Sequence, residues 1–308
     1  MKIIVAGGTG FIGSALVSRL LKDGHTVVLL TRNGKISSEQ FPHKESPSLS
    51  IVQWDGKTDG AWSDSIDGAD AVINFSGASI AGKRWTKPQK ELLLSSRIDP
   101  TRAIVGAISK AKKKPGVFVN ASAVGYYGNV PDGEVTEDSP SGSDYLSGLC
   151  RAWESEAREA EQSGVRVVML RTGIVLGRSG GALKKMLLPF QLFAGGPIGT
   201  GKQWMPWIHL EDEIGVVLFV LQEQSISGPV NVTASNPVMM KEFATRLGHA
   251  IHRPSWASVP AFVLKIALGE MADMLLGGQK AVPKKLLSNG FKFQYGKLEN
   301  ALKVILQE

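Results

Sequence analysis

The amino-acid sequence predicts an α/β protein built on a doubly wound parallel sheet, with helices on both faces. Short apolar runs rich in β-branched residues alternate with patterns of helical period through the first 172 residues, which is the order of elements expected for such a sheet. A glycine-rich turn joins the first of these runs to the first helical pattern. The chain has 308 residues, 43% of them apolar, which is ample for a substantial core.

The first unit consists of a strand, a turn, a helix and a second strand. An apolar strand is expected over residues 2–6, and the turn follows at once over residues 7–13. Apolar residues then recur at helical spacing up to Gly24, and a second buried strand is expected over residues 26–30. A unit of this order that contains such a turn indicates a dinucleotide-binding site.

The glycines of this turn have separate physical roles. Two of them reduce side-chain bulk where the backbone must approach a pyrophosphate, and Gly13 lets the helix pack closely on the strand. Free N–H groups at the start of the helix then face the anion. From this segment, the predicted cofactor site includes Gly7, Thr9, Gly10, Phe11, Ile12 and Gly13.

The end of the second strand predicts which dinucleotide binds. An NAD site usually has an Asp or a Glu here, which accepts a hydrogen bond from the ribose 2′-hydroxyl, and this chain has neither. Arg32 is suited to a 2′-phosphate because its guanidinium matches the phosphate oxygens. We therefore expect NADP(H), with Thr31 and Arg32 in its site; the alternative is an exposed arginine in a loop.

Further elements continue the alternation after a polar stretch over residues 34–48, which is expected to be a surface loop. Strands are expected at 50–54, 70–75, 117–121 and 165–170, and helices at 87–112 and 146–162. Ligands gather outside the carboxyl ends of such strands, and Ser122 stands at one of them. The predicted cofactor site also includes Asp55, Phe75, Ser76, Gly77, Arg97 and Val175.

From Gly173 onward the alternation loosens and glycines become frequent. Helices are expected at 183–193, 241–250, 261–276 and 298–306, and a late strand at 228–233. We predict a nucleotide-binding domain over residues 1–172, to which the segment near 205–235 returns. Segments 173–204 and 236–308 are predicted to form a smaller, mainly helical domain that covers the cleft.

The composition argues against several classes of protein. The net charge is +7, but no continuous basic face with interleaved aromatic residues is evident, so we expect no nucleic-acid partner. The single cysteine, Cys150, allows no internal disulfide and fits a reducing compartment. The apolar runs are too short for an integral membrane segment, and the five histidines form no metal-binding pattern. We expect a cytoplasmic protein, or one of an organellar matrix if a leader has been removed.

Several of these residues resemble the motifs of the extended short-chain dehydrogenases/reductases. The resemblance rests on Gly7-x-x-Gly10-x-x-Gly13, Ser122, Tyr127-Gly128, and the segments 207–212 and 230–232. Segments 171–177, 186–190, 195–199 and 279–283 are similar to an atypical branch labelled "epimerase family protein", of which some members are called SulA-like cell-division inhibitors. The resemblance implies a Rossmann-type fold, NADP(H) binding and a small C-terminal domain over the cofactor, and it implies no particular substrate.

A typical member of this superfamily uses a Tyr and a Lys four residues apart on one helix, together with a Ser. This chain lacks the pair. Counting from Tyr145 reaches Leu149. The alternative register pairs Leu146 with Cys150. This departure puts ordinary Tyr–Lys catalysis in doubt.

Other residues are candidates for catalysis and for the substrate pocket. Ser122 is one, with Tyr127 or Tyr126 as the proton donor; the alternative is that both tyrosines pack in the core with a hydrated hydroxyl. Candidates for the substrate pocket are Trp204, Trp207 and His209. The alternative for the tryptophans is a domain interface, and for the histidine a structural role before a helix that Asp212 would cap.

The sequence leaves two functions open. One is an NADP(H)-dependent oxidoreductase or epimerase that acts on an unknown small molecule through a modified proton relay. The other is a catalytically weak NADP(H)-binding sensor or partner-binding protein, in line with the division-related label. Its candidate surfaces for a protein partner or a second copy are the apolar segment 262–276 and the basic segment 280–285.

Overall fold

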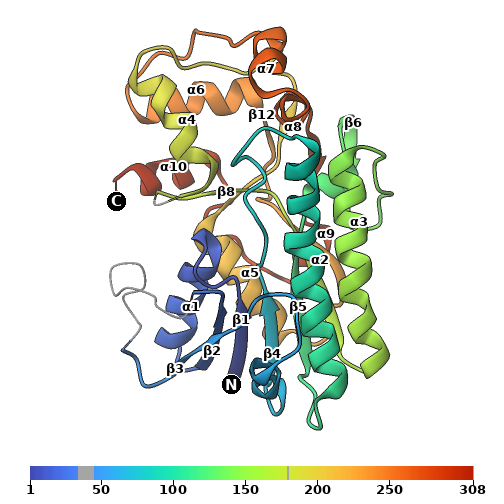
Figure 1. The fold of residues 1–308 in the computed structure, drawn as a ribbon. Coiled ribbons are helices and arrows are strands. Elements are labelled where there is room, and N and C mark those ends of the chain that lie inside the picture. Colours follow the sequence, from blue (N-terminus) through green and yellow to red (C-terminus); the bar gives the residue numbers. More distant parts are fainter. Residues whose placement is uncertain (34–44, 179, 308) are drawn as a thin grey trace.

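The computed structural model describes residues 1–33, 45–178 and 180–307. Most of the loop expected over residues 34–48 therefore lies outside the described residues. Figure 1 shows a lobe built on a large sheet and a second, mainly helical lobe stacked on it. We call the first, with residues 1–33, 45–172 and 210–232, the sheet lobe. The second, with residues 181–205, 238–276 and 298–307, is the helical lobe.

Seven parallel strands form the sheet, in the order β11-β7-β5-β4-β1-β2-β3. They are β1 (Lys2–Ala6), β2 (Thr26–Thr31), β3 (Leu49–Gln53), β4 (Ala71–Asn74), β5 (Val117–Ala123), β7 (Arg166–Thr172) and β11 (Gly228–Val232). Each neighbouring pair is parallel; Ile3, for example, aligns with Val27 on one side and Ala71 on the other. The predicted doubly wound parallel sheet is confirmed.

Helices cover both faces because successive strand residues point to opposite sides of the sheet. The covering helices are α1 (Phe11–Lys22), α2 (Lys87–Lys110), α3 (Tyr145–Arg158) and α5 (Leu210–Gln222). Ile3 and Val5 belong to a buried core that includes side chains of α1 and α5. Ile4 and Ala6 belong to a second core, with side chains of α2 and α3. Each face of β1 is therefore buried against a helical layer.

The order of the strands creates a crevice at one edge of the sheet. The chain passes from β1 outward to β2 and β3, and then returns across β1 to β4. Connections that leave in opposite directions separate the loops that follow β1 and β4. Open α/β sheets bind their ligands at such a point, outside the carboxyl ends of the strands.

The helical lobe has a core of its own, which includes Leu183, Phe190, Phe243 and Leu302. Its helices are α4 (Gly181–Gln191), α6 (Met240–Ala250), α7 (Ala261–Leu268), α8 (Met271–Leu276) and α10 (Leu298–Gln307). The prediction of one helix over residues 261–276 is wrong, because Gly269 adopts a φ of +62° between α7 and α8. None of the helices in the described part of the chain has the length and apolar character needed to cross a membrane.

Three short strand pairs connect distant parts of the chain, and none was expected from the sequence. They are β6 (Val130–Val135) with β13 (Gln279–Ala281), β8 (Ile174–Leu176) with β10 (Trp207–His209), and β9 (Trp204–Met205) with β12 (Val238–Met239). Helix α9 (Lys284–Ser288) follows β13 and packs against β11. Strand β10 leads directly into α5, so its position sets where that helix begins.

Candidate functional site

The glycine turn lies at the crevice and is packed too tightly for side chains. Gly7 has a φ of +76°, and a Cβ there would lie 2.5 Å from the carbonyl carbon of Phe75. A Cβ on Gly13 would lie 2.3 Å from the carbonyl oxygen of Gly7. Gly10 closes the turn by donating its N–H to that same oxygen at 3.1 Å. These contacts require glycine at positions 7 and 13 for reasons of space.

Helix α1 starts from this turn with its first N–H groups uncapped. Gly10 is the N-cap and offers no side-chain acceptor, and the first turn of the helix contains no acidic residue. Thr9 and Gly10 are exposed, while Phe11 and Ile12 are half-buried. Unpaired N–H groups and the positive end of the helix dipole together attract an anion. The turn is therefore suited to hold a phosphate group against its backbone.

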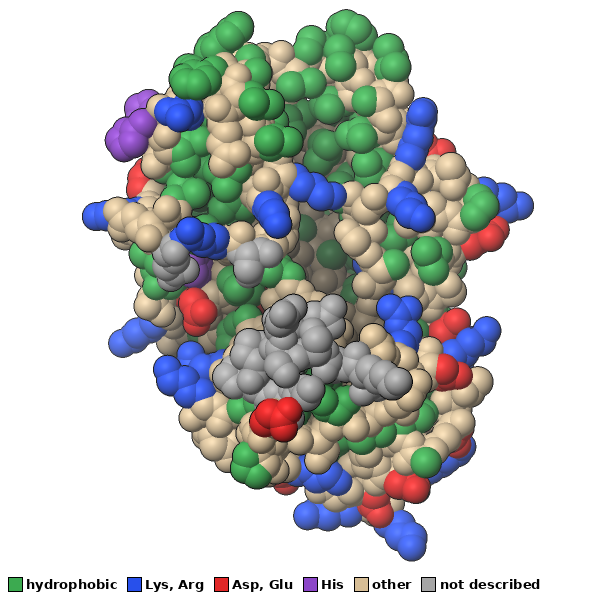
Figure 2. Space-filling view, turned by 60° about the vertical axis from the view of Figure 1, so that its left-hand side comes forward, with side chains coloured by type: hydrophobic (Ala, Val, Ile, Leu, Met, Phe, Trp, Pro, Cys, Tyr) green, Lys and Arg blue, Asp and Glu red, His purple; other side chains and the backbone are tan. Residues whose placement is uncertain are grey.

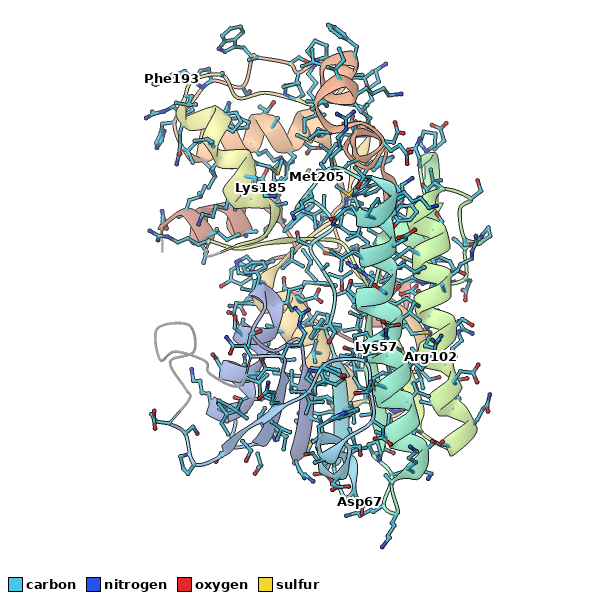
Figure 3. The ribbon with its side chains drawn as sticks, viewed as in Figure 1. Lys57, Asp67, Arg102, Lys185, Phe193 and Met205 are labelled. Carbon is cyan, nitrogen blue, oxygen red and sulfur yellow. The ribbon has the colours of Figure 1, made fainter. Side chains whose placement is uncertain are left out.

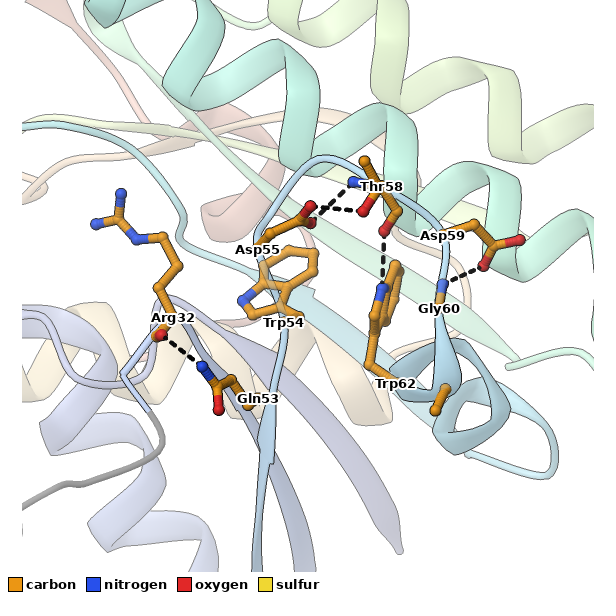
Figure 4. Close-up of a pocket in the computed structure, with 9 residues that line it drawn as sticks. Arg32, Gln53, Trp54, Asp55, Thr58, Asp59, Gly60 and Trp62 are labelled. Carbon is orange, nitrogen blue, oxygen red and sulfur yellow. Dashed lines mark hydrogen bonds between the residues drawn. The ribbon is translucent and has the colours of Figure 1, made fainter.

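Arg32 follows β2 at the same edge and is exposed. It borders an open pocket of about 610 Å³, to which Trp54, Asp55, Thr58 and Trp62 also contribute. Figure 4 shows Arg32 and Asp55 on neighbouring segments at this edge, with the two indole rings between them and Gly60. The preceding residue, Thr31, is buried and its hydroxyl accepts a hydrogen bond from the N–H of Asn33 at 3.3 Å. An exposed cation beside a pocket with aromatic walls suits a phosphorylated nucleoside.

The carboxylate of Asp55 holds the loop that forms one side of this pocket. It accepts hydrogen bonds from the N–H groups of Lys57 and Thr58, both at 2.8 Å, and from the Thr58 hydroxyl at 2.5 Å. The hydrogen bonds from Thr58, its hydroxyl first, lower the pKa of Asp55 to about 2. Asp55 therefore stays ionised and fixes the loop, and its predicted place beside the adenine stays a prediction.

The segment after β4 is held from below by buried polar groups. The amide of Asn74 accepts a hydrogen bond from the N–H of Ser76 at 3.0 Å and donates to Asn120 at 2.8 Å. Arg97, only 8% exposed, lies beneath Gly77 and donates to the carbonyl oxygen of Ala78 at 3.1 Å. Phe75 and Ser76 are half-buried and Gly77 is exposed. The strand tip thus presents backbone to the crevice, with a buried cation behind it.

A second glycine-rich loop closes over Phe11 from the opposite side. A Cβ on Gly177, Gly180 or Gly181 would lie within 2.9 Å of the Phe11 ring. The loop follows β8, in which Val175 is buried and pairs with Ile208 of β10. The Phe11 ring therefore packs against the glycines that precede α4, while its backbone N–H belongs to the uncapped first turn of α1.

Ser122, at the carboxyl end of β5, is engaged in a buried network of hydrogen bonds. Its hydroxyl donates to Oε1 of Glu154 at 2.7 Å. The same carboxylate forms a two-point ion pair with Arg171, at 2.8 and 2.9 Å. Ser122 is 5% exposed, and both charged side chains are almost fully buried. The hydroxyl proton of Ser122 is therefore committed inside the protein.

Tyr127 belongs to the same network. Its hydroxyl donates to Oδ1 of Asn231 at 2.6 Å and accepts from Nη1 of Arg171 at 3.0 Å. Burial raises the pKa of Tyr127 to about 12. Tyr126 differs, because it is half-buried and its ring lies 3.4 Å from the Arg171 guanidinium. All three predicted catalytic residues thus lie around Arg171, but the hydroxyls of Ser122 and Tyr127 already form hydrogen bonds to buried side chains.

The helix that carries the Tyr–Lys pair in typical relatives presents apolar side chains here. Leu146 and Cys150 face the turn after β5, within 3.9 Å of a Cβ built on Gly125. Burial raises the pKa of Cys150 to about 12, so its thiol stays protonated. Tyr145 points elsewhere and donates its hydroxyl to the carbonyl oxygen of Lys90 at 2.9 Å. Neither register provides a tyrosine with a lysine beside Ser122.

Two of the three residues predicted for the substrate pocket are buried in the helical lobe or beneath it. Trp207 is 1% exposed and packs in the core of the helical lobe. His209 is 4% exposed, and its ring stacks on Tyr295 with centroids 4.0 Å apart. Trp204 is half-buried beneath Lys280, whose Nζ lies 5.1 Å from the ring centroid. Trp204 is therefore the only one of the three with exposed surface.

The prediction that Asp212 caps a helix is wrong. His209 is the N-cap of α5, and its Nδ1 accepts the N–H of Glu211 at 3.1 Å. Burial lowers the pKa of His209 to about 4, which keeps the imidazole neutral and able to accept. Asp212 instead accepts the backbone N–H groups of Gln294 and Tyr295, at 2.8 and 2.9 Å. It anchors a C-terminal segment rather than its own helix.

A hollow separates the two lobes, and Figure 2 shows Lys or Arg side chains around its mouth. Figure 3 places Lys185 at the end of α4 nearest the sheet lobe. Its Nζ donates to the carbonyl oxygen of Ala81 at 2.8 Å, across the hollow from α4 to the segment after β4. The half-buried residues Phe75, Ala78 and Tyr126 pack against one apolar cluster beside this segment. The hollow therefore adjoins the cofactor edge and carries positive charge at its entrance.

Sequence reasoning missed Glu154 and Arg171 as the centre of the buried network. The one available signal was an arginine placed directly after the apolar run 165–170, because a charge at such a position needs a buried partner. That signal does not identify the partner, which lies on another helix. Across the described ranges, no group of three His, Cys, Asp or Glu residues is arranged to hold a metal ion.

Comparison with known proteins places this site in a family. Residues 3–233 match the model of the NAD dependent epimerase/dehydratase family, and residues 259–305 match a domain of unknown function, DUF1731. The chain is 43% identical over 310 residues to epimerase family protein YfhF of Bacillus subtilis, with 100% of this chain and 99% of that protein covered.

A plant relative and a solved human structure agree with this match. The chloroplastic SDR39U1 homolog of Arabidopsis thaliana, an epimerase family protein, is 42% identical over 309 residues, with 100% of this chain and 87% of that protein covered. The crystal structure of human epimerase family protein SDR39U1 with NADPH superimposes with a TM-score of 0.87 at 35% identity, and each chain is 100% covered. The chain therefore belongs to the NAD dependent epimerase/dehydratase family.

Proposed function

We propose that the chain binds NADP(H) along the carboxyl edge of the sheet, with the pyrophosphate at the start of α1 and the 2′-phosphate at Arg32. The observation that carries the proposal is the turn from Gly7 to Gly13, which excludes side chains and leaves the first N–H groups of α1 uncapped. The human relative crystallised with NADPH supports the phosphorylated cofactor. The end of β2, where an NAD site usually has an Asp or a Glu, carries neither, and this supports it as well.

The remaining predicted contacts follow the same edge. Thr9 and Ile12 would lie beside the phosphates, and the segment Phe75–Gly77 would support the dinucleotide from the far side of the crevice. Arg97 would add positive charge behind that segment, and Val175 would contribute an apolar wall. When bound, the nicotinamide supplies or accepts a hydride, and these residues position it and exclude water.

We further propose that a small-molecule substrate occupies the hollow between the lobes. In this arrangement the helical lobe, which makes up most of the smaller domain predicted over 173–204 and 236–308, covers the cofactor edge. Tyr126 and Trp204, both half-buried, are the candidate side chains for its lining. The positive charge at the mouth of the hollow supports an anionic substrate.

The buried network bears on which of the two functions is favoured. Ser122 and Tyr127 have their hydroxyls engaged by Glu154, Arg171 and Asn231, so we assign them a positioning role. An oxidoreductase or epimerase of this architecture would rely on Tyr126 as its proton donor. NADPH oxidation with a panel of carbonyl compounds tests this, because turnover that is lost in Tyr126→Phe supports an enzyme.

The second candidate function, an NADP(H)-binding sensor, is supported by the same engaged hydroxyls and by the apolar residues Leu146 and Cys150 in place of a Tyr–Lys pair. A sensor would bind NADPH tightly and oxidise it with no carbonyl in the panel. It would also change its interaction with a partner or surface when NADPH binds. Measured turnover of any substrate at an ordinary enzymatic rate would exclude this function.

The cofactor proposal is tested by titrating the purified chain with NADPH and following nucleotide fluorescence. Gly13→Ala places a methyl group 2.3 Å from a carbonyl oxygen and must displace the turn. We expect it to weaken NADPH binding by at least about tenfold, or ~1.4 kcal/mol. Gly106→Ala is the matched control, because nothing lies within 4 Å of its Cβ on α2. Equal affinities in the two variants would contradict the proposal.

The structure also bears on compartment and partners. We infer a reducing compartment, such as the cytoplasm or an organellar matrix, because Cys150 is the only cysteine and is buried. Of the two candidate interaction surfaces, the basic one is largely engaged: Lys280 pairs with Glu134 at 2.9 Å, and Lys285 donates to the carbonyl oxygen of Ser227 at 2.7 Å. We therefore propose that an interaction uses the apolar segment 262–276.

A further inference from the structure

One end of the helical lobe exposes a group of large apolar side chains, which we call the apical patch. It consists of Leu188, Leu192, Phe193, Trp256, Phe262, Val263 and Ile266. Trp256 is 75% exposed, Ile266 73% and Leu192 69%. Figure 2 shows hydrophobic side chains gathered over this end of the molecule. Contiguous apolar surface of this kind marks a site of interaction.

Backbone pairing makes the patch one continuous surface. The segment after α4 runs beside the segment before α7: the N–H of Ala257 donates to the carbonyl oxygen of Gly195, and that of Val259 to Pro197, both at 3.1 Å. The Arg253 guanidinium lies 4.5 Å from the ring centroid of Phe193. Figures 1 and 3 place α7 and Phe193 at the end of the molecule away from the sheet.

Helix α7 forms the largest part of the patch and lacks the pattern of an ordinary surface helix. None of its eight residues is buried, and Lys265 is its only charged residue. A helix on the surface of a soluble domain normally buries an apolar stripe and exposes a polar face. Helix α7 instead exposes Phe262, Val263 and Ile266 to water. Its composition is suited to an apolar environment that the folded chain does not itself supply.

Basic residues outnumber acidic residues around the patch. Segments 181–202 and 249–269, which carry the patch, contain no Asp or Glu and five Lys or Arg residues, of which Lys185 lies towards the sheet lobe and bonds to Ala81. The nearest acidic residues after α7 are paired, Asp273 with Lys265 at 3.5 Å and Glu270 with Lys90. Two copies of this surface facing one another would bring like charges together. The charge therefore favours an anionic surface over a second copy of the chain.

We propose that the apical patch docks on an anionic lipid surface. Trp256, Phe262 and Ile266 enter the boundary between headgroups and acyl chains, and Lys184 and Arg253 contact lipid phosphates. The side chains protrude from the end of the lobe, so they fit a deformable bilayer better than a rigid protein partner, whose surface would need matching pockets. Basic residues near the surface of an anionic membrane add electrostatic attraction to apolar insertion.

Vesicle flotation of the full-length chain tests this proposal. We expect binding to vesicles of phosphatidylcholine mixed with phosphatidylglycerol, and much weaker binding to phosphatidylcholine alone. Phe262→Ser/Ile266→Ser should reduce partitioning by more than about tenfold, because two inserted apolar side chains are lost. Leu92→Ser/Leu94→Ser is the matched control: both leucines are exposed on α2, at 50% and 40%, and lie outside the patch.

Circular dichroism and NADPH titration of each variant would show that the fold is kept, since all four positions are exposed. Equal flotation of the patch variant and the control would overturn the proposal, as would equal binding to neutral and anionic vesicles. Light scattering tests whether a second copy of the chain occupies the patch instead. A wild-type dimer that ignores vesicles and becomes monomeric in the patch variant would assign the surface to self-association and refute lipid docking.

Discussion

Replacing Glu154 by glutamine tests the buried network at its centre. The substitution keeps the shape of the side chain and removes its negative charge. In the structure this carboxylate accepts the Ser122 hydroxyl and two N–H groups of Arg171. Glutamine can accept with its one oxygen, but its NH₂ group then faces a guanidinium or hydroxyl donor. The variant therefore leaves a buried cation without a counter-charge.

The expected loss of unfolding free energy in Glu154→Gln follows from the burial of the ion pair. The side chains of Arg171 and Glu154 are 2% and 3% exposed. Removing one partner of a buried pair costs about 3–5 kcal/mol of unfolding free energy, because the other charge stays buried and uncompensated. Glu156, two residues further along α3, pairs with Arg102 at 2.7 Å, but the Arg102 side chain is 64% exposed. Glu156→Gln should therefore cost at most about 1 kcal/mol.

Urea denaturation at neutral pH compares the two variants with the wild type. The two variants are comparable because each exchanges a carboxylate for an amide on the same helix. We expect equal m-values, and a urea midpoint for Glu154→Gln well below that of Glu156→Gln because only Glu154 belongs to a buried ion pair. A difference between them of less than about 1 kcal/mol would show that the buried pair stabilises the fold no more than an exposed pair does. The network would then not be a main support for the end of β5.

Two further variants probe buried groups of the sheet lobe. Burial raises the pKa of Glu213 to about 8, from 4.5, so the folded state holds a proton that the unfolded state releases. Stability should fall as pH rises towards 8, by up to about 1.4 kcal/mol per pH unit, and Glu213→Gln should remove this slope. Urea midpoints between pH 6.5 and 8 measure this slope without a contribution from His209. The lowered pKa of His209 changes stability only below pH 6.5. Tyr127→Phe should cost about 1–3 kcal/mol, since it removes the acceptor of one Arg171 N–H and the donor to Asn231 Oδ1, and should leave NADPH affinity unchanged. Tyr145→Phe, at a half-buried hydroxyl, is its control and should cost less; equal costs would contradict the assignment.

The parts of the fold that the sequence predicted are those with local signals. Strand β1, the glycine turn and α1 follow one another within the first 22 residues, and each carries its own period or turn chemistry. The same holds for the central strands β4, β5 and β7, which contain apolar runs because both of their faces are buried. Boundaries differ by one or two residues, as at β7, where Arg171 and Thr172 continue the strand.

Features that depend on distant contacts were not predictable in the same way. Strand β6 pairs with β13, which lies more than 140 residues along the chain, and its exposed sequence shows no alternation. Trp207 and His209 belong to a motif that suggested a pocket, but β10 pairs with β8 and buries both side chains. Pattern alone does not show which side of a short strand becomes enclosed.

The candidate site also has features that depend on local sequence and features that depend on distant contacts. The tight packing at Gly7 and Gly13 could be predicted because it depends on the local turn, whereas the role of Arg32, inferred from its place after a strand, stays a prediction. Ser122 was correctly placed at a strand end, but its partner Glu154 lies 32 residues away on α3. Whether a hydroxyl is free or engaged is a property of such tertiary contacts, and the sequence does not encode it locally.

Binding of the phosphorylated dinucleotide at this edge of the sheet can be measured as the ratio of NADPH to NADH affinity. The wild-type chain should bind NADPH more tightly, and Arg32→Gln should remove about 1.5–3 kcal/mol of that preference, or roughly ten- to a hundredfold, while leaving NADH affinity unchanged. Arg19→Gln, an exposed arginine on α1 that pairs with Asp23, serves as the control. A wild-type chain that binds NADH as tightly as NADPH, or an Arg32 variant that keeps the full preference, would show that Arg32 does not hold the 2′-phosphate.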